Sequence, residues 1–136
     1  MPAVLVVLAL HDAALLGDRS FDLVVIDEAC QSTEPGCWVP LPRGRRVVLA
    51  GDHCQLPPTV LAREAAAEGF GVSLMERLVS LYGEGITRLL TVQYRMHRAI
   101  MDFSSREFYG GELEADASRV AEAAVGEPVV RRRPVG

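Results

Sequence analysis

The stretch from Phe21 to Leu56 decides the fold, and it reads FDLVVIDEACQSTEPGCWVPLPRGRRVVLAGDHCQL. It contains two apolar runs, Leu23–Ile26 and Val47–Ala50, and each run leads into a turn that carries acidic residues. Four consecutive aliphatic residues are typical of a strand that is buried on both faces, as in a parallel sheet covered by helices. We therefore predict an α/β fold in which these two runs are neighbouring strands.

The turns after these strands contain the candidate functional residues. Asp27 and Glu28 follow the first strand, and the second strand leads into the GDHCQ turn, Gly51–Gln55. Open α/β sheets bind their ligands outside the carboxyl ends of the strands. An acidic pair at one strand end and a Gly-Asp-x-x-Gln turn beside it predict a site for a nucleotide and a metal ion.

Each residue type in these turns suits that chemistry. In phosphoryl-transfer enzymes one acid holds Mg²⁺ and another residue positions or polarises the attacking nucleophile. Gly51 lets the backbone turn closely beneath a ligand, and Asp52 can accept backbone N–H bonds within the turn. The Gln55 amide can contact a phosphate oxygen or the lytic water without adding charge. The alternatives are a solvated acidic pair at a strand end and a plain turn stiffened by prolines.

A third cluster, QYRMH, spans Gln93–His97. Arg95 offers a planar, always-charged guanidinium that suits a phosphate, and Tyr94 beside it offers a face on which a base could stack. The alternative is a surface arginine beside a half-buried aromatic residue. His97 is expected near the start of a helix rather than as a ligand.

Composition and charge narrow the class of protein. The net charge of −4 provides no basic field that could hold nucleic acid by itself, and all 14 cationic side chains are arginines. The three cysteines show no zinc-binding spacing, so we expect small core residues with reduced thiols in an intracellular protein, cytoplasmic or nuclear. The apolar run Met1–Leu10 is shorter than the roughly 20 residues that span a bilayer, so no membrane association is expected.

Outside the central stretch, apolar and polar segments predict further strands and a loop. Strands are expected at Ala3–Leu10 and Ile86–Val92, and a loop is expected over Gln31–Gly36. The patch Trp38–Pro42 is ambiguous because prolines bound it. Trp38 itself is expected in the core or in an interface.

Three helices are predicted, the first a short one over Leu61–Ala67. Ser73 and Glu76 have the spacing of a capping box, which predicts a helix from there to about Tyr82. The residues expected on its apolar face are Leu74, Leu78 and Leu81. The last helix is predicted over His97–Phe108. The residues expected to point inward from it are Ile100, Phe103 and Phe108.

In this order and at this spacing, the three clusters resemble the DNA/RNA helicases of superfamily 1, in particular the Upf-like branch that includes the immunoglobulin μ-binding helicase. The matching strings, between about Phe21 and Leu113, are VVIDEACQS, VVLAGDHCQLPPTV, SLMERL and LLTVQYRMHRAI. The resemblance implies a RecA-like, P-loop NTPase-type parallel sheet flanked by helices. Residues 1–91 would form the C-terminal part of a first lobe, residues 92–117 the start of a second lobe, and residues 118–136 a flexible tail.

The resemblance also implies a role for each candidate residue, with ATP and Mg²⁺ as cofactors. Asp27 would bind Mg²⁺, and Glu28 would be the general base for the attacking water. Gln55 would sense the γ-phosphate, Tyr94 would stack near the adenine, and Arg95 would act as an arginine finger. Single-stranded DNA or RNA would be the partner of the full-length family member.

One family motif has no counterpart in this sequence. The phosphate-binding loop G-x-x-x-x-G-K-[ST] should precede Asp27, but no stretch fits it and the chain contains no lysine. We therefore expect an incomplete sheet without the phosphate-loop strand, and a helicase fragment that is inactive alone. The alternative is a non-catalytic remnant or partner-binding module whose sheet is completed by the missing helicase segments or by another chain. A metal hydrolase that uses Asp27 and Glu28 has less support.

Overall fold

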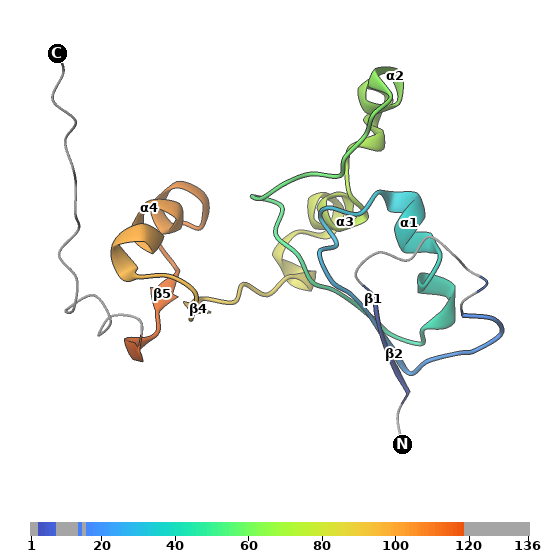
Figure 1. Cartoon of the computed structure of the whole chain (residues 1–136), viewed down its shortest axis with the longest axis horizontal. Coiled ribbons are helices and arrows are strands. Elements are labelled where there is room, and N and C mark those ends of the chain that lie inside the picture. The colour runs from blue at the N-terminus through green and yellow to red at the C-terminus, as the bar shows by residue number, and fades with distance from the viewer. Residues whose placement is uncertain (1–2, 8–13, 15, 119–136) are drawn as a thin grey trace, which may run out of the picture. The chain divides into compact units, whose positions relative to one another are not determined.

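The computed structural model describes residues 3–7, 14 and 16–118. The chain divides into two compact units, Met1–Thr87 and Arg88–Gly136 (Figure 1). Apart from Ser118, the tail predicted over residues 118–136 lies outside the described residues.

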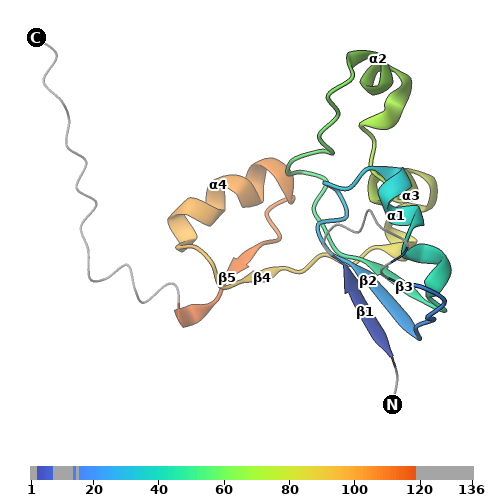
Figure 2. The same cartoon turned by 45° about the vertical axis from the view of Figure 1, so that its right-hand side comes forward.

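The first unit is built on a three-stranded parallel sheet with the order β1-β2-β3 (Figure 2). The strands are β1 (Val4–Val7), β2 (Leu23–Ile26) and β3 (Val47–Leu49). The two apolar runs of the central stretch are therefore neighbouring strands, and the predicted parallel α/β sheet is confirmed. The strand predicted over Ala3–Leu10 is confirmed as β1, while residues 8–10 lie outside the described part of the chain.

The core covers one face of this sheet. Val24 and Ile26 of β2 are buried and pack with Ala29, Cys37 and Leu74. The last two belong to helices α1 (Glu34–Trp38) and α3 (Leu74–Tyr82). The Arg77 guanidinium of α3 also forms an ion pair with the Glu34 carboxylate of α1.

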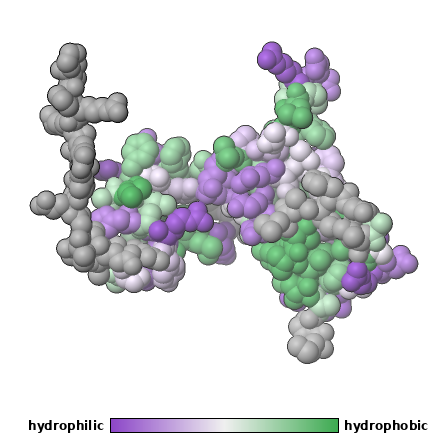
Figure 3. Space-filling view, in the orientation of Figure 1, coloured by the Kyte–Doolittle hydropathy of each residue, from purple (hydrophilic) through white to green (hydrophobic). Residues whose placement is uncertain are grey.

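The opposite face of the sheet is exposed, which corrects the prediction of strands buried on both faces. Val6, Val25 and Val48 lie in register across this face. The exposed fractions of Val6 and Val48 are 64% and 48%, and that of Val4 is 52%. A hydrophobic area is visible over β1 and β2 in Figure 3. The apolar runs predict a second covering layer, but none of the described elements supplies it.

Helix α1 occupies part of a stretch that was predicted to be a loop. It begins at Glu34 with a proline in its first turn. Backbone N–H groups in the first turn make no hydrogen bond within the helix, so a proline, which lacks an N–H, is tolerated there. Reading Pro35 as a loop signal was therefore wrong. Trp38 is 54% exposed, and its indole Nε1 donates to Glu34 Oε1 at 3.2 Å. Of its two expected positions, the core is therefore wrong, and an interface stays a prediction. A 3₁₀ turn, η2 (Leu41–Arg43), follows.

Helix α3 agrees with its predicted limits. The Ser73 hydroxyl accepts a hydrogen bond from the Glu76 backbone N–H at 3.1 Å, which satisfies one of the unpaired amides of the first turn. Gly83, with φ 62°, ends the helix. Leu74 is buried, but Leu81 is 67% exposed, so its predicted place on the covered face is wrong.

The short helix predicted over Leu61–Ala67 is present as α2 (Arg63–Ala65), which continues into a wider π turn, η3 (Ala66–Phe70). By contrast, the strand predicted over Ile86–Val92 is wrong for most of its length. Residues 83–86 form a 3₁₀ turn, η4, and only Val92–Gln93 becomes a strand, β4. Among the described residues, β4 pairs with β5 (Glu114–Ala115) alone.

The described part of the second unit contains β4, β5 and helix α4 (Arg98–Phe108). His97 caps this helix through Nδ1, which accepts from the Ala99 N–H at 3.2 Å, so its predicted place at a helix start is confirmed. The predicted inward face is wrong, because Met101 and Ser105 are the buried residues. The residues predicted to point inward are exposed: Ile100, Phe103 and Phe108. None of the helices described is long and apolar enough for a membrane span.

Candidate functional site

The acidic turn after β2 exposes both of its carboxylates. Glu28 has φ 51°, the left-handed region, and is the only non-glycine residue with positive φ in the described part of the chain. Its N–H donates to Asp27 Oδ1 at 3.0 Å. The Gln31 side chain then reaches back, and its Nε2 donates to Glu28 Oε2 at 3.0 Å. Strained backbone of this kind is concentrated at functional sites, and here it occurs at the predicted acids.

The turn after β3 is organised by Asp52. Its Oδ1 accepts from the Cys54 N–H at 3.0 Å, and its Oδ2 accepts from Gln55 Nε2 at 2.7 Å. The predicted acceptance of backbone N–H bonds by Asp52 is therefore confirmed. The Gln55 side chain is exposed but held at its amide nitrogen.

The two turns touch through their backbones. The Ala29 N–H donates to Ala50 O at 2.8 Å. A Cβ on Gly51 would lie 3.0 Å from Cys30 N and 3.1 Å from Ala29 N, so any larger residue would push the two backbones apart by a few tenths of an ångström. Glycine favours this close approach, which brings the acidic turn and the glutamine turn together at the carboxyl end of the sheet.

The thiol of Cys30 reports on the charge around both turns. Burial raises its pKa most, and the negative charges of Asp52, Glu76 and Glu28 raise it further, against a hydrogen bond with Ser73 that lowers it. Acids from both turns therefore lie close enough to influence one thiol. Cys30 and Cys37 are buried, as expected of small core residues, whereas Cys54 is only partly buried.

Two groups of side chains could hold a cation. Asp27 offers an exposed carboxylate at a strand end, and oxygen ligands of that kind fit Mg²⁺, which is held by one or two carboxylates together with substrate phosphates. Asp52, His53 and Cys54 present ligand atoms within 4.8 Å of one another. Their mixed oxygen, nitrogen and sulfur donors suit a softer ion such as zinc rather than Mg²⁺.

In the second unit, the QYRM turn is shaped by Gln93. Its Oε1 accepts from the Arg95 and Met96 N–H groups at 2.9 Å and 2.8 Å, and its Nε2 donates to Met96 O at 2.7 Å. Tyr94 is 61% exposed, and Arg95 is exposed as well. These two candidates therefore belong to the second unit, whereas Asp27, Glu28 and Gln55 belong to the first.

Three supporting contacts were not predicted from the sequence: Gln31 with Glu28, Asp52 with Gln55, and the backbone bonds of Gln93. Each involves an amide or carboxylate within three residues of its partner, as Asx-type turns do. A systematic search for such short-range pairs beside the candidate residues would have suggested them.

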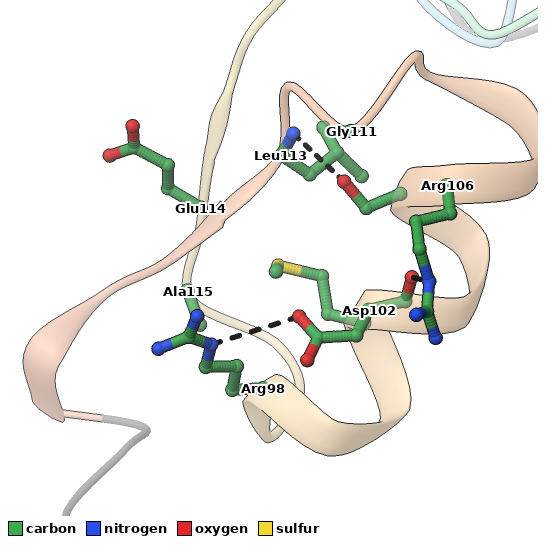
Figure 4. A pocket seen from close by; sticks show the side chains of 9 residues that line it. Arg98, Asp102, Arg106, Gly111, Leu113, Glu114 and Ala115 are labelled. Atoms are coloured by element: carbon green, nitrogen blue, oxygen red, sulfur yellow. Dashed lines mark hydrogen bonds and ion pairs between the residues drawn. The ribbon is translucent and has the colours of Figure 1, made fainter.

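A pocket of about 450 Å³ lies in the second unit between α4 and β5 (Figure 4). At its wall, Arg98 Nε lies 3.8 Å from Asp102 Oδ1, and the Leu113 N–H donates to Ser105 Oγ at 3.1 Å. The lining of this pocket includes none of the candidate residues.

Comparisons with known proteins show which family the chain resembles. Two family models, each described as an AAA domain, match residues 6–63 and 70–132. The DNA-binding protein SMUBP-2 of Mesocricetus auratus is 51% identical over 104 residues, which cover 76% of this chain and 10% of the relative. An uncharacterized ATP-dependent helicase of Methanocaldococcus jannaschii is 44% identical over 104 residues, which cover 76% of this chain and 15% of the relative. The regulator of nonsense transcripts 1 homolog of Arabidopsis thaliana is 45% identical over 113 residues, which cover 82% of this chain and 9% of the relative.

A parallel sheet with helices packed on it, and acids at the carboxyl end of its central strand, fits the RecA-like α/β class of helicase domain folds. Within that class, the chain belongs to the superfamily 1 helicases, in their Upf-like branch. It spans 9–15% of the length of the relatives compared above.

Proposed function

We propose that this chain carries the catalytic turns of an ATP-dependent DNA or RNA helicase: a metal-binding acid, a general base, a γ-phosphate sensor and an arginine finger. The observation that supports this most is the close approach of the two turns at Gly51, where a Cβ would meet Cys30 N at 3.0 Å. That approach places the turns that carry Asp27, Glu28 and Gln55 side by side at the end of the sheet where α/β proteins bind ligands.

In this proposal Asp27 would hold Mg²⁺ through a carboxylate oxygen, and the ion would supply charge neutralisation for the phosphates. Glu28 would accept a proton from the attacking water. Gln31 donates to Glu28 Oε2, so Oε1 is the atom we assign to that proton. The exposed carboxylates leave space for the ligand.

We extend the proposal to the second unit because its Tyr94 and Arg95 side chains are exposed and could reach a ligand. Tyr94 would stack near the adenine, and Arg95 would stabilise the charge that develops on the transferred phosphoryl group. Residues 1–91 would then be the end of the first lobe and residues 92–117 the start of the second. Single-stranded DNA or RNA would be the partner of the whole protein.

The metal site can be tested with Mn²⁺ as a paramagnetic substitute for Mg²⁺. We expect Mn²⁺ to broaden the NMR signals of the acidic turn and of Gln55 first, and Asp27→Asn to abolish that preference. Asp18→Asn, which removes another exposed carboxylate from the same unit, is the matched control. Broadening spread evenly over the surface acids, or unchanged by Asp27→Asn, would contradict the proposal.

The isolated chain is expected neither to hydrolyse ATP nor to unwind a duplex. It has no G-x-x-x-x-G-K-[ST] loop and no lysine, so the triphosphate would lose its backbone cradle and a cationic partner. ATPase assays with and without single-stranded nucleic acid should match those of Glu28→Gln. Turnover that Glu28→Gln removes would show that the chain is active by itself.

A partner-binding module is the second candidate function, and the exposed sheet face favours it. Val4, Val6 and Val48 are 52%, 64% and 48% exposed, and β3 pairs only with β2 among the described strands. Light scattering distinguishes the cases, because a monodisperse, soluble monomer would argue against a chain that depends on a partner.

A further inference from the structure

The glutamine turn contains an arrangement that decides which end of the Gln55 amide faces outward. Asp52 uses both carboxylate oxygens within the turn: Oδ1 accepts from the Cys54 N–H at 3.0 Å, and Oδ2 accepts from Gln55 Nε2 at 2.7 Å. The Gln55 backbone N–H also donates to Asp52 O at 3.1 Å. Asp52 is partly buried, whereas Gln55 is exposed to any ligand that approaches.

A glutamine amide has two ends of similar shape, so its orientation follows from its hydrogen-bond partners. An ionised carboxylate only accepts hydrogen bonds, so it must meet the NH₂ end of Gln55. Charge-assisted bonds of this kind are about twice as strong as neutral ones. The carbonyl oxygen Oε1 is then the end of the amide turned away from Asp52, together with the one remaining N–H.

We propose that Asp52 is a positioning residue that makes Gln55 present its Oε1 acceptor to the ligand. This inference rests on the proposed function for the identity of that ligand. Phosphate oxygens accept hydrogen bonds, so they cannot pair with Oε1, whereas the attacking water can donate to it. Gln55 would therefore orient the water through Oε1 and would have only one N–H left for a γ-phosphate oxygen.

Asp52→Asn reverses this arrangement without a change of size. The Cys54 N–H can only donate, so the oxygen of the new asparagine must stay opposite it. The asparagine NH₂ group then faces Gln55, which must turn its own Oε1 toward it. The variant would therefore present the NH₂ end of Gln55 to the ligand.

The chain is well suited to a direct test, because it contains three glutamines, Gln31, Gln55 and Gln93, and no asparagine. Its side-chain amide NMR spectrum therefore has three pairs of proton signals. We expect a Gln55 Nε2 proton of the folded chain to exchange with water about tenfold more slowly than in the urea-unfolded chain, as a hydrogen bond to a charged group requires. This measurement needs no variant.

In Asp52→Asn, the protection should leave Gln55 and appear on the new asparagine NH₂ signals. Gln31 and Gln93, whose Nε2 groups bond to Glu28 and Met96, are internal controls and should not change. Unprotected Gln55 protons in the folded wild-type chain would overturn the inference, as would protection that Asp52→Asn does not move. No nucleotide is added, so failure here is distinct from failure of the Mn²⁺ test: either result can stand without the other.

Discussion

The two units expose their candidate residues by different means. In the first unit, the acidic turn follows β2, whose buried Val24 and Ile26 anchor it to a core, and the glutamine turn follows β3, whose half-buried Leu49 packs against that core. In the second unit, the QYRM turn follows a two-residue strand, and the side chain of Gln93 organises it. A site held by packing depends on residues distant in sequence, whereas a turn held by one side chain depends on its neighbours. The two should therefore respond differently to substitution.

The largest effect is expected from the core of the first unit. Ile26 is 2% exposed, and Ile26→Ala should lower the unfolding free energy of that unit by about 2–5 kcal/mol, because a cavity is left beneath both turns. Urea unfolding followed by residue-specific NMR measures the two units separately. Val48→Ala, on the exposed face, is the control and should have a much smaller effect. Equal losses in both units would show that they do not unfold independently.

A smaller effect is expected where the two turns meet. Gly51→Ala places a Cβ at 3.0 Å from Cys30 N, so one backbone must move, at a cost of roughly 1–3 kcal/mol. The amide signals of Ala29 and Cys30 should shift with it. Gly71→Ala is the matched control, because a Cβ there meets nothing within 4 Å and φ is −80°. If both variants behave alike, the close approach at Gly51 is wrong.

In the second unit, Gln93→Ala should loosen the turn that carries Tyr94 and Arg95. The Arg95 and Met96 N–H groups would lose their acceptor, which should cost about 1–2 kcal/mol since both can still find water. Hydrogen exchange at these two amides should accelerate, while the first unit keeps its protection. Unchanged exchange would mean that the turn persists without the Gln93 side chain.

The smallest expected effect is a difference between the two units in how their stability depends on pH. All three cysteines lie in the first unit, and burial, the largest cause, raises the pKa of each thiol. A raised folded pKa contributes stability below the ordinary thiol pKa, and this contribution is lost as pH rises through the folded value. Alkaline pH should therefore weaken the first unit more than the second. Cys30→Ala and Cys37→Ala should reduce the difference, as measured by urea unfolding across that range.

Local signals in the sequence predicted the elements whose partners are local. The Ser73–Glu76 spacing predicted α3, and His97 was expected at the start of α4, because a cap joins a side chain to an amide two or three residues away. The acidic pair after β2 and the Gln55 turn were likewise found from apolar runs and the residues that end them. The sequence thus supplied the candidate residues, while their membership of one site and their roles stay proposals.

Several predictions that required distant partners failed, although the pairing of β2 with β3 was predicted correctly. Ile86–Val92 has the composition of a strand, but among the described residues only Val92 and the following Gln93 pair with another strand. Helix α4 has several apolar residues to bury, and the contacts of its own unit cover Met101 and Ser105 instead. The proline within α1 was wrongly interpreted as a sign of a loop, because proline is common both in loops and in the first turn of a helix.

By itself, the sequence determined the two central strands, the acids at their ends and the helix caps, since the length of an apolar run and side-chain capping act over a few residues. Tertiary structure decided which face of the sheet is covered, how closely Gly51 approaches Cys30, and which way α4 turns. These depend on contacts between residues far apart in the chain, and no local pattern records which surfaces meet. The orientation of the Gln55 amide depends on both sequence and tertiary structure. Its partner Asp52 is only three residues away in the sequence, but only the folded turn shows that the amide nitrogen, rather than the oxygen, faces Asp52.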